Sequence, residues 1–429
     1  MSDGSGSLIA NRCTHARRPL FARPLIAMTQ AVDPALCYAR VERHERMVVD
    51  FRGAHGWAQD SADQQQLEVG AHLAENTDAV ILVGGKGTRL RPLTNSVPKP
   101  MMPTAGVPFL QHLLGRIKAA GMTHVVLGTS FKAEVFQEHF GDGSDLGLEI
   151  EYVVEEEALG TGGGIRNVLP SLRHDNALVF NGDVLGGTDL RAVLGTHATK
   201  HADVTMHLVR VPDPRAFGCV PTNEDGRVTA FLEKTMDPPT DQINAGCYVF
   251  KRETIERIPE NRVVSVEREV FPKLLDDGLR VYGHVDQAYW RDMGTPADFV
   301  RGSSDLVRGI AYSPILVGKT GEALVDSSAQ IGGGALLLGG TYVGRGCEVG
   351  GGSRLDTTVL FDGVEVEAGA TLERCIVAAG ARIGARAVLR DAVIGEGAVI
   401  GARCELIDGV RVWPGVNIPD GGIRFSTDV

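Results

Sequence analysis

The sequence contains one decisive stretch, which reads Gly84-Gly85-Lys86-Gly87-Thr88-Arg89-Leu90-Arg91-Pro92-Leu93-Thr94 and is followed by Pro98-Lys99-Pro100. It comes directly after residues 79–83, Ala-Val-Ile-Leu-Val, whose continuous apolar character predicts a buried parallel strand. Glycines at the end of such a strand expose backbone N–H groups to which a phosphate can bind. Three cationic residues, Arg89, Arg91 and Lys99, add positive charge, so the loop suits a triphosphate.

This loop differs from the two common phosphate-binding motifs. A dinucleotide fingerprint, G-x-G-x-x-G, requires a third glycine at the position where Leu90 stands. The Walker A motif ends in Gly-Lys-Ser/Thr, and the chain has this ending only at residues 318–320, where Ser313 occupies the place of the motif's first glycine. We therefore interpret residues 318–320 as part of a linker and the Gly84 loop as a different kind of phosphate site.

Composition limits the classes of function. A chain of 429 residues predicts two or three domains, and a net charge of −11 argues against a nucleic-acid partner. The seven cysteines are scattered without a C-x-x-C motif, which excludes a zinc ligand set and a disulfide framework and suits a reducing cytoplasm. Apolar runs of the roughly 18 residues that a membrane span needs are missing from the sequence, so we expect no membrane association.

The first 75 residues differ in amino-acid composition from the rest of the chain. Residues 2–7 are rich in glycine and serine, and the arginines that follow make the next part basic. An apolar segment at residues 20–31 is interrupted by Arg23 and Pro24, whereas a signal peptide requires an unbroken apolar core. We predict that residues 1–75 form an N-terminal extension without order and without a role in chemistry.

Residues 76–310 alternate between strand-like and helix-like patterns, which predicts an α/β domain with a mostly parallel, Rossmann-like sheet. The expected strands are residues 79–83, 124–127, 150–154, 177–180, 204–211 and 247–250, and the expected helices include residues 109–120, 134–140 and 189–199. Ligands of such sheets bind beyond the carboxyl ends of the strands. The Gly84 loop lies at the first of these ends.

Residues 311–429 carry a different pattern, in which aliphatic residues recur at a spacing near six and are often followed by glycine. Examples are Ile331-Gly332, Val343-Gly344, Val349-Gly350, Ile383-Gly384, Ile394-Gly395 and Ile400-Gly401. This imperfect hexapeptide repeat predicts a parallel β-helix, in which each coil buries its aliphatic residues against the next. We expect this domain to support a homo-oligomer.

Further motifs follow predicted strands in the first domain. Residues 155–164 read Glu-Glu-Glu-Ala-Leu-Gly-Thr-Gly-Gly-Gly, and these glycines let the backbone approach a flat ligand closely. Asp183 follows the strand at 177–180, and Asp292 stands in the run Trp290-Arg291-Asp292-Met293-Gly294-Thr295. An aspartate at the carboxyl end of a strand is placed to meet a ligand. The chain also contains the short segments Glu233-Lys234 and Asn244-Ala245-Gly246.

Taken together, these motifs resemble the signature of the sugar-1-phosphate nucleotidylyltransferases, and the closest resemblance is to the bacterial mannose-1-phosphate guanylyltransferases. It covers residues 76–429. It implies a catalytic domain followed by a left-handed β-helix, and a Mg²⁺-dependent reaction of GTP with mannose 1-phosphate to give GDP-mannose and diphosphate. Two departures occur in the expected base-recognition segment: Ala158 replaces a proline and Gly162 replaces an alanine.

The resemblance also assigns roles to residues. It implies that Arg89, Lys99 and Lys234 are catalytic and that Asp183 and Asp292 bind the metal. The residues that it implies for substrate binding are Gly84, Gly85, Gly87, Thr88, Glu157, Gly160, Thr161, Gly218, Glu233, Asn244 and Gly246.

Three alternatives remain open at this level. The substrates could be a thymidine or uridine nucleotide with glucose 1-phosphate, although the Leu159–Gly163 segment and the context of Asn244 favour guanine and mannose. A non-catalytic sugar-nucleotide-binding homologue would be expected to lack Arg89, Lys99 or an aspartate, and all are present. A second, acyl-transferring activity of the β-helix is disfavoured, because the chain has no histidine after His284 to act as a base.

Overall fold

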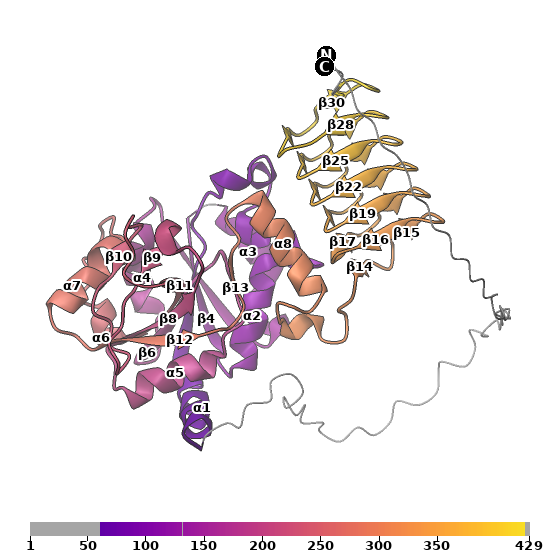
Figure 1. Cartoon of the computed structure of the whole chain (residues 1–429). Coiled ribbons are helices and arrows are strands. Elements are labelled where there is room, and N and C mark those ends of the chain that lie inside the picture. The colour runs from indigo at the N-terminus through magenta and orange to yellow at the C-terminus, as the bar shows by residue number, and fades with distance from the viewer. Residues whose placement is uncertain (1–60, 131, 425–429) are drawn as a thin grey trace, which may run out of the picture. The chain divides into compact units, whose positions relative to one another are not determined.

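The computed structural model describes residues 61–130 and 132–424. Its catalytic part is built on a nine-stranded sheet with the order β10-β9-β11-β6-β1-β4-β5, in which β8 pairs with β11 and β12 (Figure 1). The strands are β1 (Thr77–Leu82), β4 (His124–Thr129), β5 (Glu149–Val154), β6 (Asn176–Asn181), β8 (Val204–Arg210), β9 (Gly218–Cys219), β10 (Leu232–Glu233), β11 (Gln242–Lys251) and β12 (Val281–Asp286). All six strands expected from the sequence are therefore confirmed.

The sheet has a parallel half and a mixed half. β6, β1, β4 and β5 are parallel, as the alternation of strands and helices predicts, and they carry their carboxyl ends to one edge. β11 runs antiparallel to β6, β8 and β9, and β8 and β12 are parallel to each other. The sequence analysis did not predict β12 (Val281–Asp286). Its residues, Val-Tyr-Gly-His-Val-Asp, contain no continuous apolar run.

Helices cover both faces of this sheet. One face packs against α2 (Phe109–Ala119), α3 (Ala133–Phe140) and α5 (Leu190–Thr199), and the other against α4 (Gly160–Asn167), α6 (Arg252–Ile255) and α7 (Phe271–Asp276). Successive side chains of β1 point to opposite faces of the sheet. Ala79 and Ile81 lie in the apolar cluster with α2, α3 and α5, whereas Val80 lies in the cluster with α4, α6 and α7. This alternation is what a strand that is buried on both sides requires.

Two short pairings complete the catalytic part. β2 (Pro103–Thr104) pairs with β3 (Val107–Pro108), and β7 (Val184–Gly186) pairs antiparallel with β13 (Trp290–Asp292). After β13, α8 (Pro296–Val307) leads toward the second domain. Among the described residues, no helix combines the length and the apolar character that a membrane span requires.

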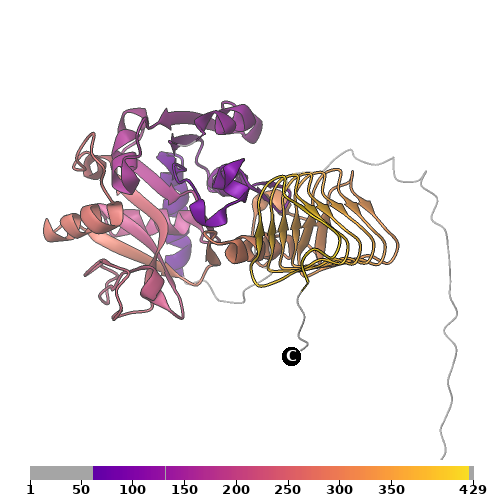
Figure 2. The same cartoon turned by 90° about the horizontal axis from the view of Figure 1, so that it is seen from above.

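The C-terminal part consists of three stacks of short parallel strands, consistent with the left-handed β-helix implied by the sequence (Figure 2). The first stack is β14 (Ala323–Val325), β17 (Thr341–Val343), β20 (Val359–Leu360), β23 (Ile376–Val377), β26 (Val393–Ile394) and β29 (Arg411–Val412). The second is β15 (Gln330–Ile331), β18 (Glu348–Val349), β21 (Glu365–Val366), β24 (Arg382–Ile383), β27 (Val399–Ile400) and β30 (Asn417–Ile418). The third is β16 (Leu336–Leu338), β19 (Arg354–Asp356), β22 (Thr371–Glu373), β25 (Val388–Arg390) and β28 (Glu405–Leu406).

Each coil of the β-helix contains three of these strands and spans 17 or 18 residues. Val343 pairs with Leu360, 17 positions later, and Leu336 pairs with Arg354, 18 positions later. The interior is filled by one aliphatic column per stack, for example Val343, Leu360, Val377 and Ile394 in the first stack. Three hexapeptides therefore make one turn, which explains the spacing near six.

The prediction that residues 1–75 lack order is wrong for residues 61–74. Residues 61–74 form helix α1 (Ser61–Ala74), whereas residues 1–60 lie outside the described part of the chain. α1 packs on α5, and the Gln66 side chain donates hydrogen bonds to Ala192 O at 3.1 Å and Thr196 Oγ1 at 2.8 Å. A Cβ atom at Gly70 would lie 1.8 Å from Arg191 O. The sequence analysis missed this helix because Gln66 and Gly70, which lie at its contact with α5, give no apolar signal.

We predict that Gly70→Ala lowers the midpoint of thermal unfolding. Alanine favours a helix by about 1 kcal/mol over glycine, but overpacking a tight contact typically costs about 1–3 kcal/mol, and here the new methyl group would meet a backbone carbonyl. The control is Glu68→Ala, which removes an exposed side chain from the same helix. A melting curve for Gly70→Ala that equals or exceeds that of the control would show that α1 is not held against α5.

Candidate functional site

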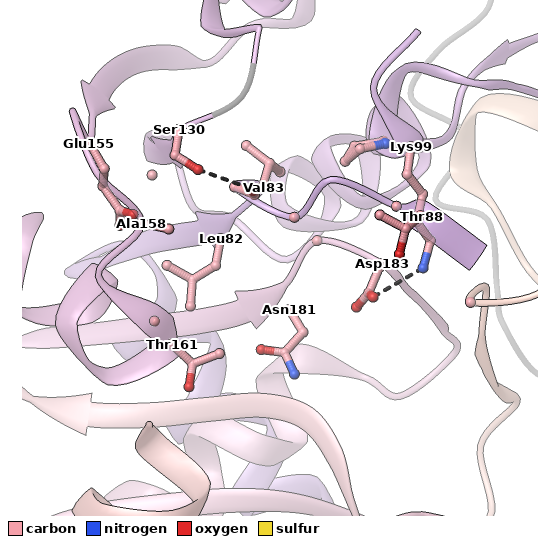
Figure 3. Close-up of a pocket in the computed structure, with 18 of the residues that line it drawn as sticks. Leu82, Val83, Thr88, Lys99, Ser130, Glu155, Ala158, Thr161, Asn181 and Asp183 are labelled. Carbon is pink, nitrogen blue, oxygen red and sulfur yellow. Dashed lines mark hydrogen bonds and ion pairs between the residues drawn. The ribbon is translucent and has the colours of Figure 1, made fainter. Parts of the chain in front are cut away.

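A cavity of about 530 Å³ lies beyond the carboxyl ends of β1, β4 and β6 (Figure 3). Its lining comes from five segments of the chain: the end of β1 with the loop through Pro100, the end of β4, the 155–161 segment, the end of β6, and Gly294 after β13. The lining residues are Leu82, Val83, Gly84, Gly85, Gly87, Thr88, Arg89, Lys99, Pro100, Gly128, Ser130, Glu155, Ala158, Gly160, Thr161, Asn181, Gly182, Asp183 and Gly294. The cavity thus lies where ligands of an open parallel sheet are expected to bind.

Turns and a hydrogen bond within the Gly84 loop fix its backbone conformation. Gly87 has a φ of +57°, a left-handed conformation that favours glycine, and its carbonyl accepts a hydrogen bond from Thr94 Oγ1 at 2.9 Å. The next residues form a 3₁₀ turn, Thr88–Leu90, in which Leu90 is buried. This places the Arg89 side chain at the cavity, with 65% of its surface exposed.

Lys99 is the buried cation of the site. It begins the 3₁₀ turn Lys99–Met101, and only 7% of its side-chain surface is exposed. Lys99 Nζ donates a hydrogen bond to Asp183 Oδ2 at 3.0 Å and lies 3.8 Å from Asp292 Oδ1. Arg89 Nη2 lies 3.9 Å from Asp292 Oδ2. Two cations and two carboxylates thus meet at one end of the cavity.

The pairing of β7 with β13 brings the two aspartates together. Asp292 pairs with Val184, and Met293 N donates a hydrogen bond to Asp183 O at 3.0 Å. Burial and the neighbouring Asp183 raise the pKa of Asp292, although Lys99 and Arg89 act in the opposite direction. Asp292 Oδ1 is buried without a hydrogen-bond partner. An unsatisfied anionic oxygen beside a second carboxylate fits a divalent cation, since hard cations take oxygen ligands.

No larger metal cage is found in the described ranges, because no three His, Cys, Asp or Glu side chains there gather as a possible ligand set. Asp183 and Asp292 are therefore the two protein ligands that this end of the cavity can offer. One or two carboxylates, with the remaining positions filled by water and phosphate oxygens, are typical of nucleotide-bound Mg²⁺.

The 155–161 segment forms the opposite end of the cavity. Glu155, which directly follows β5, is half buried and accepts a hydrogen bond from Leu159 N at 3.1 Å. Burial raises the pKa of this carboxyl, while that hydrogen bond lowers it. Gly160 and Thr161 line the cavity as the sequence predicts, and Thr161 Oγ1 also donates to Glu267 Oε2 at 2.8 Å. Thr161 is therefore fixed by a second element.

Glu157 does not lie where the sequence predicts. It is exposed and is not among the residues that line the cavity. The carboxylate at the cavity is that of Glu155, because β5 ends at Val154 and the turn that starts α4 then carries residues 156 and 157 outward. Three consecutive glutamates give no sequence signal that distinguishes the inward one.

The residues predicted to bind the sugar lie on neighbouring strands. Glu233 of β10 pairs with Gly218 of β9, and strand β9 in turn pairs with β11. In β11, Asn244 Nδ2 donates to Tyr248 Oη at 2.6 Å, and Gly246 N donates to Asn244 Oδ1 at 2.9 Å. Lys234 is 60% exposed, with Nζ 3.7 Å from Glu233 Oε1.

None of these five residues lines the 530 Å³ cavity. Gly246 lines a smaller adjoining space of about 20 Å³, and Asn181 lines both spaces. Asn181 is thus a site residue that the sequence analysis missed, although it stands two positions before Asp183. Ser130 was also missed; its Oγ donates to Gly84 O at 2.9 Å and supports the phosphate loop from β4.

Known proteins resemble both parts of the chain. Residues 78–309 match the nucleotidyl transferase family, and residues 319–421 match the GMPPB C-terminal domain. A mannose-1-phosphate guanylyltransferase from Mycobacterium tuberculosis is 69% identical over 353 residues, which is 82% of this chain and 98% of that protein.

More distant relatives are similar over the same part. The mannose-1-phosphate guanylyltransferase catalytic subunit beta of Drosophila pseudoobscura pseudoobscura is 34% identical over 62% of this chain and 73% of that protein. A crystal structure of HddC from Yersinia pseudotuberculosis, complexed with GMP-PN, is 29% identical over 53% of this chain and 99% of its own, with a TM-score of 0.48. With over half of its length matched and the fold and cavity described above, the chain belongs to the nucleotidyl transferase family.

Proposed function

We propose that this nucleotidyltransferase is a mannose-1-phosphate guanylyltransferase, which converts GTP and α-D-mannose 1-phosphate to GDP-mannose and diphosphate. The observation that carries the proposal is the meeting of Lys99, Arg89, Asp183 and Asp292 beside the glycine loop, where the first three line the cavity and Asp292 lies within 4 Å of both cations. The 69% identity to a protein named for this activity supports the choice of substrates.

The reaction joins a sugar-phosphate oxygen to the α-phosphorus of GTP and breaks the bond from that phosphorus to the bridging oxygen of the diphosphate. The nucleophile is already an anion, so no general base is needed, and the barrier is lowered by alignment and by neutralising charge. Backbone N–H groups of the Gly84 loop bind the phosphates, and Arg89 and Lys99 neutralise the charge that moves onto the diphosphate. Lys99 is already fixed, since it is buried and hydrogen-bonded to Asp183.

Asp183 and Asp292 are the proposed ligands of Mg²⁺, which when bound would neutralise phosphate charge and help to align the reacting groups. Before the cation binds, Lys99 keeps the two carboxylates close to each other in spite of their repulsion. The raised pKa of Asp292 is the sign of that repulsion and of burial.

We propose a different place for each substrate. We assign guanine to the segment from Glu155 to Thr161, and the sugar to the side of Asn181, Gly246 and Asn244. Gly218, Glu233 and Lys234 lie beyond them, on or next to the neighbouring strands β9 and β10. Lys234 is exposed, and it would orient the sugar phosphate once that substrate is bound. Assembly into a homo-oligomer through the β-helix, and a cytoplasmic location, stay predictions from the sequence.

We predict that GTP with mannose 1-phosphate gives a kcat/KM at least about tenfold above any other pair of nucleotide and sugar phosphate. A site that hydrogen-bonds guanine leaves buried polar groups unpaired with a wrong base, at a cost of about 1–3 kcal/mol for each group. Initial rates over a matrix of nucleoside triphosphates and sugar 1-phosphates measure this directly. Faster turnover of a thymidine or uridine nucleotide with glucose 1-phosphate would replace the proposed substrates.

We predict that Asp183→Asn and Asp292→Asn each shift the Mg²⁺ titration of activity to higher concentration, because each change removes one anionic ligand. Asp213→Asn serves as the control, since Asp213 is an exposed aspartate paired with Arg215. An unchanged titration for both site variants would mean that the metal is held elsewhere.

We predict that Arg89→Ala lowers kcat by about two to three orders of magnitude, the typical effect of removing one donor that stabilises transition-state charge. The side chain is largely exposed, so the melting temperature should change little. Steady-state kinetics together with a melting curve separate the two effects, and near-normal turnover would refute this role for Arg89.

A further inference from the structure

One arginine of the β-helix reaches the phosphate loop of the catalytic domain. Arg411, in β29, donates two hydrogen bonds from Nη1, to Arg89 O at 2.8 Å and to Arg91 O at 2.8 Å. The partners are separated by 322 and 320 residues in the sequence. We infer that Arg411 is a positioning residue, which holds the backbone of the phosphate loop so that Arg89 presents its guanidinium to the cavity. We name these two hydrogen bonds the Arg411 tether.

The register of the first strand stack shows that Arg411 occupies a special place. The residues paired in succession along one column are Leu324, Tyr342, Val359, Ile376, Val393 and Arg411. Tyr342, Val359, Ile376 and Val393 are buried in one apolar cluster with residues of the catalytic domain. The column is thus apolar where it packs on that domain, and it changes to arginine at the last coil of the stack.

The same apolar cluster contains two residues of the phosphate loop itself. Leu90 is fully buried there and Leu93 is 5% exposed, together with Phe299 of α8. The loop therefore has an apolar side that packs in the interface with the β-helix and a polar side that lines the cavity.

The tether adds to the hydrogen bonds that the loop makes internally. Those internal bonds use the carbonyls of Gly87, Thr88 and Pro92 as acceptors. Arg411 instead binds the carbonyls of Arg89 and Arg91. Because Arg411 donates to the very residue whose side chain lies 3.9 Å from Asp292, movement of this backbone would displace the guanidinium from the phosphates. Displacing a reacting or stabilising group by about 1 Å can cost about 100-fold in rate.

The first test compares Arg411→Ala with Arg382→Ala. Arg382 is an exposed arginine of the neighbouring stack that pairs with Glu365 at 2.9 Å, so its loss is a matched control. We expect Arg411→Ala to lower kcat by about tenfold or more, with a smaller change in KM and an unchanged melting temperature, while Arg382→Ala behaves as the wild type. Arg411→Lys should recover part of the loss, because an ammonium group can still donate to a carbonyl.

The second test is a double-mutant cycle with Arg89→Ala. If Arg411 acts through Arg89, its removal should reduce kcat much less in the Arg89→Ala background than in the wild type. An equal reduction in both backgrounds, or an Arg411→Ala enzyme that matches the Arg382→Ala control, would overturn the inference.

A third measurement separates the tether from the reaction. The effect on turnover rests on the proposed function, but the tether itself does not. Amide hydrogen exchange of the full-length protein without substrates should be faster in peptides covering residues 84–95 for Arg411→Ala than for Arg382→Ala or the wild type. Equal exchange would contradict the tether. Absence of guanylyltransferase activity in the wild type would instead refute the proposed substrates, and the exchange data would still decide about Arg411.

Discussion

The charge balance around Lys99 is the interaction on which the site depends. A buried ammonium group, 7% exposed, lies within 4 Å of the carboxylates of both Asp183 and Asp292. Removing Lys99 would leave two neighbouring carboxylates without their buried counter-charge, which is costly. To bring these groups together, the fold must unite the loop after β1, the end of β6 and the β7–β13 pair. The parallel half of the sheet and the antiparallel pairing of β7 with β13 bring these segments together.

This charge balance also explains how the site can serve an anionic substrate. Before ligands bind, the cations are partly neutralised by the aspartates, so the cavity does not carry a bare positive charge. In the proposed function, a metal ion and phosphates would take the place of these ion pairs as partners of the four side chains. Preorganised charges of this kind avoid the reorganisation that water would require.

Much of this architecture could be predicted from local patterns. The apolar run at residues 79–83 and the glycines after it are sufficient for a strand that ends in a phosphate loop, and the spacing near six is sufficient for a β-helix. Helix α1 was missed because two of the residues at its contact with α5, Gln66 and Gly70, give no apolar signal. The choice between Glu155 and Glu157 depends on where one strand ends, and the part played by Asn181 depends on which side of β6 meets the cavity. Contacts such as that of Arg411 join residues more than 300 positions apart and leave no local pattern.

The regular stacking of the β-helix coils has a consequence for which insertions and deletions this domain can accept. Neighbouring strands of a stack are about 4.8 Å apart, so each added or deleted coil before β29 would shift the last coil by that distance along the axis. A shift of this size exceeds the length of a hydrogen bond, and Arg411 would then face a different part of the catalytic domain. The number of coils between β14 and β29 therefore sets the position of Arg411 relative to the loop. Insertions are tolerable only beyond the coil that contacts the loop, or as bulges that leave the stacking of the coils intact.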